Sequence, residues 1–314
     1  MRLDALDGLR TLGHRLPRPA PPCHLRTREQ IEEEVGVIET HPAQHEAFGP
    51  DRRVHGSYPT RVTDELAERL RAAGCVFAED EANALRAAFS GEALETAVAR
   101  RIEGSPLEQV LGFAAIGDVR VDLGPGVFVP RARATAIAEI AAARRPDARI
   151  VVDLGCGAGT LAAILATRLA ARIIGTEVDP VAMSSARRTA RRYGFEVAEG
   201  SWWSPLPSSS RGRIDLAVAY LPHVPTGQLH RIHADFRAHE PEVSVDGGPD
   251  GLDPWRAVAH EAASWLAPGG LFVTLIAPEQ RTEARRIGED AGLDVEYEES
   301  DDDLVLLAHR PGDR

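Results

Sequence analysis

The feature that most constrains this chain is a glycine-rich turn between a short apolar run and a helical pattern. The run Ile150–Leu154 is apolar apart from Asp153, and glycines follow at positions 155, 157 and 159. A helical spacing of apolar residues begins at Thr160. This order predicts a buried parallel strand, a tight turn and a helix. Glycines let the backbone turn sharply and approach a ligand closely, and the N-terminus of the helix presents unpaired N–H groups.

A turn of this kind can bind NAD, FAD or S-adenosylmethionine. The Gly-x-Gly-x-Gly spacing differs from the Gly-x-Gly-x-x-Gly of the dinucleotide fingerprint, and no Gly-Lys-Ser/Thr follows that would indicate a P-loop. The stretch from Asp153 to Thr160 resembles motif I of the class I methyltransferases. That resemblance implies S-adenosylmethionine as the cofactor. A turn without a ligand is the alternative, but three glycines would then cost backbone entropy for no gain.

Composition limits the partners and the compartment. The net charge of −12 would repel DNA or RNA, so no nucleic-acid partner is expected. No run of eighteen apolar residues indicates a transmembrane helix, and the charged N-terminus does not resemble a signal peptide. The cysteines Cys23, Cys75 and Cys156 are odd in number and widely spaced, which favours reduced thiols. We therefore expect a cytoplasmic protein with no membrane partner.

Four regions follow along the chain. Residues 1–60 read as an irregular N-terminal extension, 61–108 as a helical domain, 109–130 as a β-hairpin linker and 131–314 as the cofactor-binding domain. His41 and His45 are four residues apart in the extension. Pro42 and the lack of further ligands argue against a metal ion there, and no metal is expected elsewhere. The extension could serve the active site or an interface between copies of the chain.

Strands and helices alternate after the glycine turn. Strand patterns recur at 173–177, 196–198, 215–219 and 271–276, and the 297 and 304–308 regions suggest a closing antiparallel pair. This order predicts an α/β fold with a doubly wound, mostly parallel, Rossmann-like sheet of the seven-stranded type. Glu177 ends the second strand about twenty residues after the glycines, where a carboxylate can hold both ribose hydroxyls. Trp202 follows the third strand and is placed to stack on adenine, although a core position is the alternative.

Several motifs in order give the chain a family resemblance. From about residue 70 to 310 it is similar to the HemK/PrmC-like glutamine N5-methyltransferases, as a divergent member. The matching segments are 70–74, 104–108, 126–131, the glycine turn, His239-Glu240-Pro241, 246–253, 266–270 and Gln280. The resemblance and the strand ends together assign cofactor-binding roles to Pro130, Arg131, Asp153, Gly155, Cys156, Gly157, Thr160, Glu177, Val178, Ser201, Trp202 and Tyr220.

The chain departs from the family pattern after the fourth strand. The family has Asn-Pro-Pro-Tyr there, whose Asn and backbone carbonyls accept the two protons of an amide. This chain has Tyr220-Leu221-Pro222-His223. Tyr220 supplies a hydroxyl and a flat face, and His223 can take a proton near neutral pH. We expect catalytic roles for Tyr220, Pro222 and His223, and substrate binding by Tyr220, Leu221, His223, Glu240 and Asp246.

Three hypotheses follow for the acceptor. The first is N-methylation of a planar side-chain nitrogen on a small molecule, with the guanidinium of free arginine as one concrete case. A guanidinium would need carboxylates, such as Glu240 and Asp246 or the acidic residues of the extension, and an aromatic face such as that of Tyr220. The second is methylation of a protein glutamine, with the extension docking the protein substrate. The third is a non-catalytic protein that binds S-adenosylmethionine.

Overall fold

A computed structural model describes residues 64–232, 234–300 and 303–312. The N-terminal extension predicted over residues 1–60 lies outside the described residues. So do its acidic residues, its two histidines His41 and His45, and Cys23. In the part of the chain that the structure describes, no helix is both long and apolar enough to cross a membrane.

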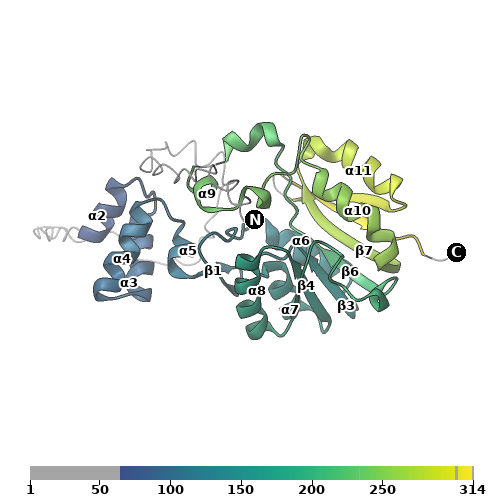
Figure 1. The fold of residues 1–314 in the computed structure, drawn as a ribbon, viewed down its shortest axis with the longest axis horizontal. Coiled ribbons are helices and arrows are strands. Elements are labelled where there is room, and N and C mark those ends of the chain that lie inside the picture. The colour runs from purple at the N-terminus through teal and green to yellow at the C-terminus, as the bar shows by residue number, and fades with distance from the viewer. Residues whose placement is uncertain (1–63, 233, 301–302, 313–314) are drawn as a thin grey trace, which may run out of the picture.

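The first described region is a small group of helices with its own core. It consists of α2 (Glu65–Ala72), α3 (Ala78–Ala88), α4 (Gly91–Ile102) and α5 (Leu107–Leu111). Their apolar faces enclose Leu70, Leu85 and Val98, all fully buried. Asp64 caps α2 by accepting hydrogen bonds from the N–H groups of Leu66 and Ala67. In Figure 1 these helices lie to one side of the main sheet.

A short antiparallel hairpin follows, made of β1 (Phe113–Ile116) and β2 (Val119–Asp122). It lies inside the 109–130 region predicted as a hairpin linker, although residues 127–129 form no strand. The hairpin is attached to the main domain, because the N–H of Asp122 donates to Oγ1 of Thr189 at 3.0 Å. Gln109 of α5 donates to the carbonyls of Val127 and His239 at 2.9 and 3.0 Å. Hydrogen bonds therefore connect the linker both to the helical region and to the main domain.

The main domain is a seven-stranded sheet with the order β5-β4-β3-β6-β7-β9-β8. Five strands are parallel, and β8 and β9 form the antiparallel edge. This confirms the predicted α/β, doubly wound, mostly parallel fold. The strands are β3 (Ile150–Leu154), β4 (Arg172–Glu177), β5 (Glu196–Glu199), β6 (Ile214–Val218), β7 (Leu266–Ile276), β8 (Asp294–Ser300) and β9 (Asp303–His309).

Helices cover both faces of this sheet (Figure 1). One face packs against α6 (Ala134–Arg144), α7 (Thr160–Arg168) and α8 (Pro180–Tyr193). The other face packs against α10 (Asp253–Trp265) and α11 (Arg281–Asp290). Both faces of the central strands are buried, which explains their nearly continuous apolar sequences.

An insertion between β6 and α10 stands at the carboxyl edge of the parallel strands. It contains the 3₁₀ turn η2 (Thr226–Arg231), the helix α9 (Ala234–His239) and the 3₁₀ turn η3 (Glu242–Ser244). Two further 3₁₀ turns are η1 (Ser208–Ser210) and η4 (Pro278–Gln280). Ligands of open α/β sheets bind at this carboxyl edge, so the insertion borders the candidate site.

Candidate active site

The glycine turn has the backbone shape that the sequence required. Gly155, Gly157 and Gly159 have φ angles of +66°, +57° and +84°, a region that residues with a Cβ rarely adopt. A Cβ on Gly155 would lie 3.0 Å from the ring of Trp202, and one on Gly159 would lie 2.7 Å from Phe195. A Cβ on Gly157 would meet no atom of the described residues within 4 Å. Gly155 and Gly159 thus allow aromatic rings to pack closely against the turn, whereas the Cβ position of Gly157 is open.

Two carboxylates hold this turn. Glu177, at the end of β4, accepts hydrogen bonds from the N–H of Gly157 at 2.8 Å and from Val178 and Asp179 at 2.8 and 2.9 Å. Asp153, at the end of β3, accepts from the N–H of Ala162 at 3.0 Å with one oxygen. Its other oxygen is buried and has no hydrogen-bond partner among the described residues. Burial raises the pKa of Asp153 to about 7, and the nearby Glu177 adds to that rise.

These features fit S-adenosylmethionine. The open side of Gly157 leaves room for close approach of a ligand, and the orphaned oxygen of Asp153 calls for a polar or cationic partner. Asp153, Gly157 and Glu177 are the residues that would hold the cofactor, at the strand edge where the fold binds nucleotides. We call residues 153–160 together with Glu177 the donor cradle.

The two adjacent tryptophans have different environments. Trp203 is fully buried, and its Nε1 donates to the carbonyl of Val258 at 3.0 Å. Trp202 is partly buried beside Gly155, with a φ of +48° that is unusual for a bulky residue. Trp202 is therefore the one that borders the donor cradle, and its stacking on adenine stays a prediction.

The remaining residues predicted at the donor side have varied positions. Thr160 is buried at the start of α7, and Val178 and Ser201 are exposed. The thiol of Cys156 is buried, which raises its pKa well above the usual value. A Cβ on Gly175 would lie 2.8 Å from the sulfur of Cys156, so this thiol is packed onto β4.

The loop Tyr220–His223 leaves the carboxyl end of β6, and backbone contacts fix its course. We call it the acceptor loop. Nε2 of Gln280 donates to the carbonyl of His223 at 2.8 Å and to that of Asp250 at 3.0 Å. A Cβ on Gly251 would lie 2.2 Å from the same carbonyl oxygen of His223. Gly251 and Gln280 therefore hold the loop closely against the segment that precedes α10.

His223 has a defined tautomer. Its Nδ1 lies 2.9 Å from the carbonyl oxygen of Leu221. A carbonyl only accepts hydrogen bonds, so Nδ1 carries the proton and Nε2 of the neutral ring keeps its lone pair. Burial lowers the pKa of His223 below its ordinary value of 6.5, so the ring is neutral at pH 7. His223 thus presents a proton acceptor.

Tyr220 lies beside His223 and Phe128. Its ring centroid is 5.8 Å from that of His223, in an edge-on arrangement, and 5.9 Å from that of Phe128. Burial raises the pKa of Tyr220 to about 12, so the hydroxyl stays protonated at neutral pH. That hydroxyl makes no hydrogen bond to any residue in the described ranges. Tyr220 therefore offers a flat face and an available hydroxyl at the strand edge.

Three of the residues predicted to bind the substrate already have contacts within the protein, and their role at the substrate stays a prediction. Glu240 is buried and accepts from the N–H of Val129 at 2.9 Å, and its Oε2 lies 2.7 Å from Nη2 of Arg131. Asp246 accepts from Oγ1 of Thr226 at 2.7 Å and from the N–H of Gly248 at 2.9 Å. The side chain of Leu221 is buried in the core beneath α10. Glu240 is thus paired with an arginine, Asp246 is hydrogen-bonded within the insertion, and Leu221 is a core residue.

Arg131, which was expected to bind the cofactor, contacts two aromatic rings and Glu240. Its guanidinium carbon lies 4.6 Å from the centroid of Phe128 and 3.9 Å from that of Phe236. Together with the ion pair to Glu240, these contacts bind the strap 128–131 to the insertion. Pro130 and Pro222 are half-buried. The guanidinium of Arg131 thus links residues 128–131 to the insertion through Glu240 and Phe236.

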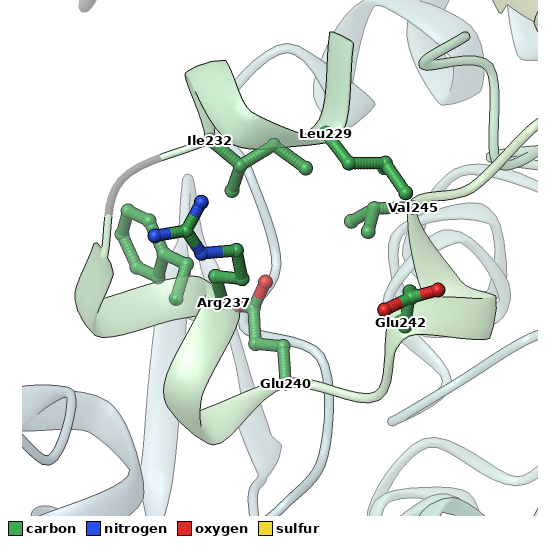
Figure 2. A pocket seen from close by; sticks show the side chains of 7 residues that line it. Leu229, Ile232, Arg237, Glu240, Glu242 and Val245 are labelled. Carbon is green, nitrogen blue, oxygen red and sulfur yellow. The ribbon is translucent and has the colours of Figure 1, made fainter. Parts of the chain in front are cut away.

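The insertion encloses a small pocket, which Figure 2 shows from close by. It has a volume of about 30 Å³, room for little more than a water molecule. Its lining residues are Leu229, Ile232, Phe236, Arg237, Glu240, Glu242 and Val245. This pocket is too small for an amino acid, and a role of Tyr220 and His223 at the acceptor stays a prediction. Among the described residues there is also no cluster of three or more His, Cys, Asp or Glu side chains that could hold a metal ion.

Sequence reasoning missed several residues around the acceptor loop. Phe128 was available in the motif at 126–131 but had no assigned role. Arg133 and Asp303 form an ion pair across 170 positions of sequence, which no local pattern could reveal. Gln280 fitted the family motif, yet its contact with the carbonyl of His223 depends on the tertiary fold.

Comparison with known proteins places the chain in a family. Residues 151–239 match the model of a methyltransferase domain. A release factor glutamine methyltransferase of Moorella thermoacetica is 32% identical over 68% of this chain and 78% of its own length. The chain belongs to the release factor glutamine methyltransferase family. The corresponding enzyme of Geobacter sulfurreducens is 38% identical over 55% of this chain and 61% of its own length.

A further relative of the chain is named for a different methyl acceptor. A 4-amino-L-phenylalanine/4-methylamino-L-phenylalanine methyltransferase of Streptomyces pristinaespiralis is 37% identical over 56% of this chain and 62% of its own length. The chain therefore matches less than two thirds of the length of the Geobacter and Streptomyces relatives. Membership of the glutamine methyltransferase family explains the donor cradle, and the acceptor loop is where this chain departs from the family pattern.

Proposed function

We propose that this protein is an S-adenosylmethionine-dependent N-methyltransferase whose acceptor is a planar side-chain nitrogen of a small molecule. One observation carries the proposal. The family's amide clamp is replaced by Tyr220 and His223, and the tautomer of His223 leaves the Nε2 lone pair available beside the Tyr220 ring. This pair is suited to orienting and deprotonating a flat N–H group.

The chemistry follows from the acceptor. When bound, S-adenosylmethionine supplies an electrophilic methyl group. The nitrogen of an amide, a guanidinium or an aromatic amine is a weak nucleophile, because its lone pair is delocalised. It loses a proton as the new N–C bond forms, and Nε2 of His223 is placed to accept that proton. Tyr220 orients the acceptor through its face and its hydroxyl.

The named relatives are consistent with this class of acceptor. Glutamine carries an amide nitrogen and 4-amino-L-phenylalanine carries an aromatic amine. Both nitrogens are planar, conjugated and on an amino-acid side chain. The guanidinium of free arginine shares these properties. Since Glu240 and Asp246 already have protein partners, and Phe128 already lies under the guanidinium of Arg131, an acceptor guanidinium would rely on the aromatic face of Tyr220.

A protein glutamine is the second candidate acceptor. The relatives named as release factor glutamine methyltransferases favour it. Against it stands the loss of the Asn whose carbonyl would accept an amide proton. A non-catalytic protein that binds the cofactor is the third possibility, and it predicts binding without turnover.

An acceptor screen separates the three functions. The full chain is incubated with S-adenosylmethionine and one candidate at a time, and S-adenosylhomocysteine is measured against a control without acceptor. The candidates are L-arginine, L-glutamine, 4-amino-L-phenylalanine and a release factor protein. We expect turnover with a free amino acid. Turnover with the release factor alone supports the second function, and cofactor binding without any turnover supports the third.

A further inference from the structure

An ion pair that the sequence did not reveal lies beside the acceptor loop. Nη1 of Arg133 lies 2.9 and 3.2 Å from the two carboxylate oxygens of Asp303. Arg133 directly precedes α6, and Asp303 is the first residue of β9. The two residues come from opposite ends of the domain in sequence, and the fold brings them together.

The topology puts this pair at the edge of the sheet that carries Tyr220. β9 pairs with β7, with Leu304 opposite Ile276, and β7 lies next to β6. Asp303 therefore stands at the carboxyl end of β7, and Tyr220 follows the carboxyl end of β6. The Tyr220 ring packs against the core on the α6 side of the sheet. The charges of Arg133 and Asp303 also influence the pKa values of both Tyr220 and His223.

Arg133 has an unused binding edge. Its contact with Asp303 uses Nη1 alone, and within the described part of the chain Nε and Nη2 make no hydrogen bond. Its side chain is 46% exposed, whereas that of Asp303 is 11% exposed. A guanidinium presents its N–H groups as a rigid fork that matches a carboxylate. In contrast to Arg131, which is held between two rings, Arg133 can take a second anion.

We propose that Arg133 binds the α-carboxylate of a free amino-acid acceptor, with Asp303 holding the guanidinium in position. This inference rests on the proposed function and narrows its substrate class. An amino acid bound in this way would direct its side-chain nitrogen toward Tyr220 and His223. A glutamine within a protein chain has no free α-carboxylate, so Arg133 would select against it.

The test compares acceptors with and without the carboxylate. L-Arginine is paired with its decarboxylated form agmatine, and 4-amino-L-phenylalanine with 2-(4-aminophenyl)ethylamine. For the wild type we expect kcat/KM to be about 10- to 100-fold higher for the amino acid of the active pair, the range for a charge-assisted hydrogen bond. In Arg133→Leu this preference should vanish through a rise in KM for the amino acid alone.

Two variants control for structure. Arg133→Lys retains a cation for Asp303 but loses the fork, so it should retain part of the preference. Arg144→Leu removes an arginine that is 41% exposed and ion-paired at the far end of the same helix, and it should leave the preference unchanged. The affinity for S-adenosylmethionine should be the same in all variants, which shows that the donor side remains folded.

The outcomes distinguish this inference from the proposed function. If Arg133→Leu retains the wild-type preference, or loses activity equally on both members of a pair, the carboxylate role is wrong and the proposed function stands. If the wild type methylates the decarboxylated analogue as well as the amino acid, the carboxylate role is wrong too. If it methylates only the decarboxylated analogues, the carboxylate role alone fails, and if it methylates neither member of any pair, both proposals fail.

Discussion

The donor cradle and the acceptor loop lie at the same edge of one sheet, but they are built differently. The shape of the cradle is set mainly by the backbone conformation of residues 153–160. Glu177 is the main partner from outside this segment, because it accepts a hydrogen bond from the N–H of Gly157. The acceptor side draws on segments that are far apart in sequence. Phe128 contacts the ring of Tyr220, and Gln280 contacts the backbone of His223.

This difference shows why one half of the site matches its family and the other does not. A cradle made of backbone tolerates few changes, because each glycine has either a left-handed φ or a neighbour at contact distance. A site made of side chains on a loop can change its chemistry while the strands beneath it stay the same. We therefore expect that donor binding and acceptor chemistry can be impaired separately.

The largest separate effect is expected from His223→Ala. Loss of a general base lowers turnover by about 100-fold or more. Since His223 lies on the acceptor loop, the Kd for S-adenosylmethionine should stay close to that of the wild type, as measured by calorimetry. His260→Ala, an exposed histidine on α10, is the matched control and should change neither quantity. A weaker cofactor affinity with unchanged kcat in His223→Ala would contradict the assignment.

The pH dependence tests the same residue without replacing it. Burial lowers the pKa of His223 below its ordinary value of 6.5, and the neutral ring is the form that we propose as the general base. Activity should therefore be level between about pH 7 and 8 and fall below pH 6.5, by about tenfold for each unit beneath the His223 pKa. The acidic limb of kcat/KM should disappear in His223→Ala. An acidic limb centred above pH 7 would show that the base is a different group.

The donor cradle is tested by Gly157→Ala. The added methyl group projects into the open side of the turn, so we expect about a tenfold rise in the Kd for S-adenosylmethionine, or about 1.4 kcal/mol. Gly117→Ala is a matched control, because Gly117 also has a φ of +57° and open space around its Cβ position. Both variants should lose similar thermal stability, since both strain the backbone alike. Equal cofactor affinity in the two variants would mean that Gly157 does not face the cofactor.

The smallest effect is expected from Tyr220→Phe. The variant keeps the ring that packs against Phe128 and loses only the hydroxyl, so kcat/KM should fall by a few-fold, about 1 kcal/mol for one hydrogen bond. Steady-state kinetics with the preferred acceptor measure this fall. Unchanged kinetics would show that the hydroxyl does not contact the acceptor and that the ring alone matters.

The sequence was enough to predict the fold and the shape of the glycine turn, because these depend on local patterns, whereas the binding of the cofactor at that turn stays a prediction. Strand and helix periodicity predicted the sheet, and the three glycines with Glu177 predicted the cradle. The two tryptophans were harder to tell apart, since burial decides their roles and neither position has a distinctive pattern. Trp203 is the core residue, and Trp202 borders the turn.

The acceptor side could not be predicted in the same way. Glu240 appeared available for a cationic acceptor, but its partner Arg131 is 109 residues away in sequence. Asp246 pairs with Thr226, which is 20 residues away, across the insertion. Arg133, which we propose binds the α-carboxylate of the acceptor, lies in a segment with no evident motif. Charged side chains at a site find their partners only through tertiary folding, so their availability must be read from the structure.

The central claim is that an unaltered donor cradle serves a rebuilt acceptor site. The most direct measurement is a competition in which the wild-type chain receives S-adenosylmethionine, a panel of free amino acids and a release factor protein together. Mass spectrometry then locates the transferred methyl group. We expect the methyl group on the conjugated side-chain nitrogen of a free amino acid. A methyl group on a glutamine of the release factor, with the amino acids unmodified, would contradict it.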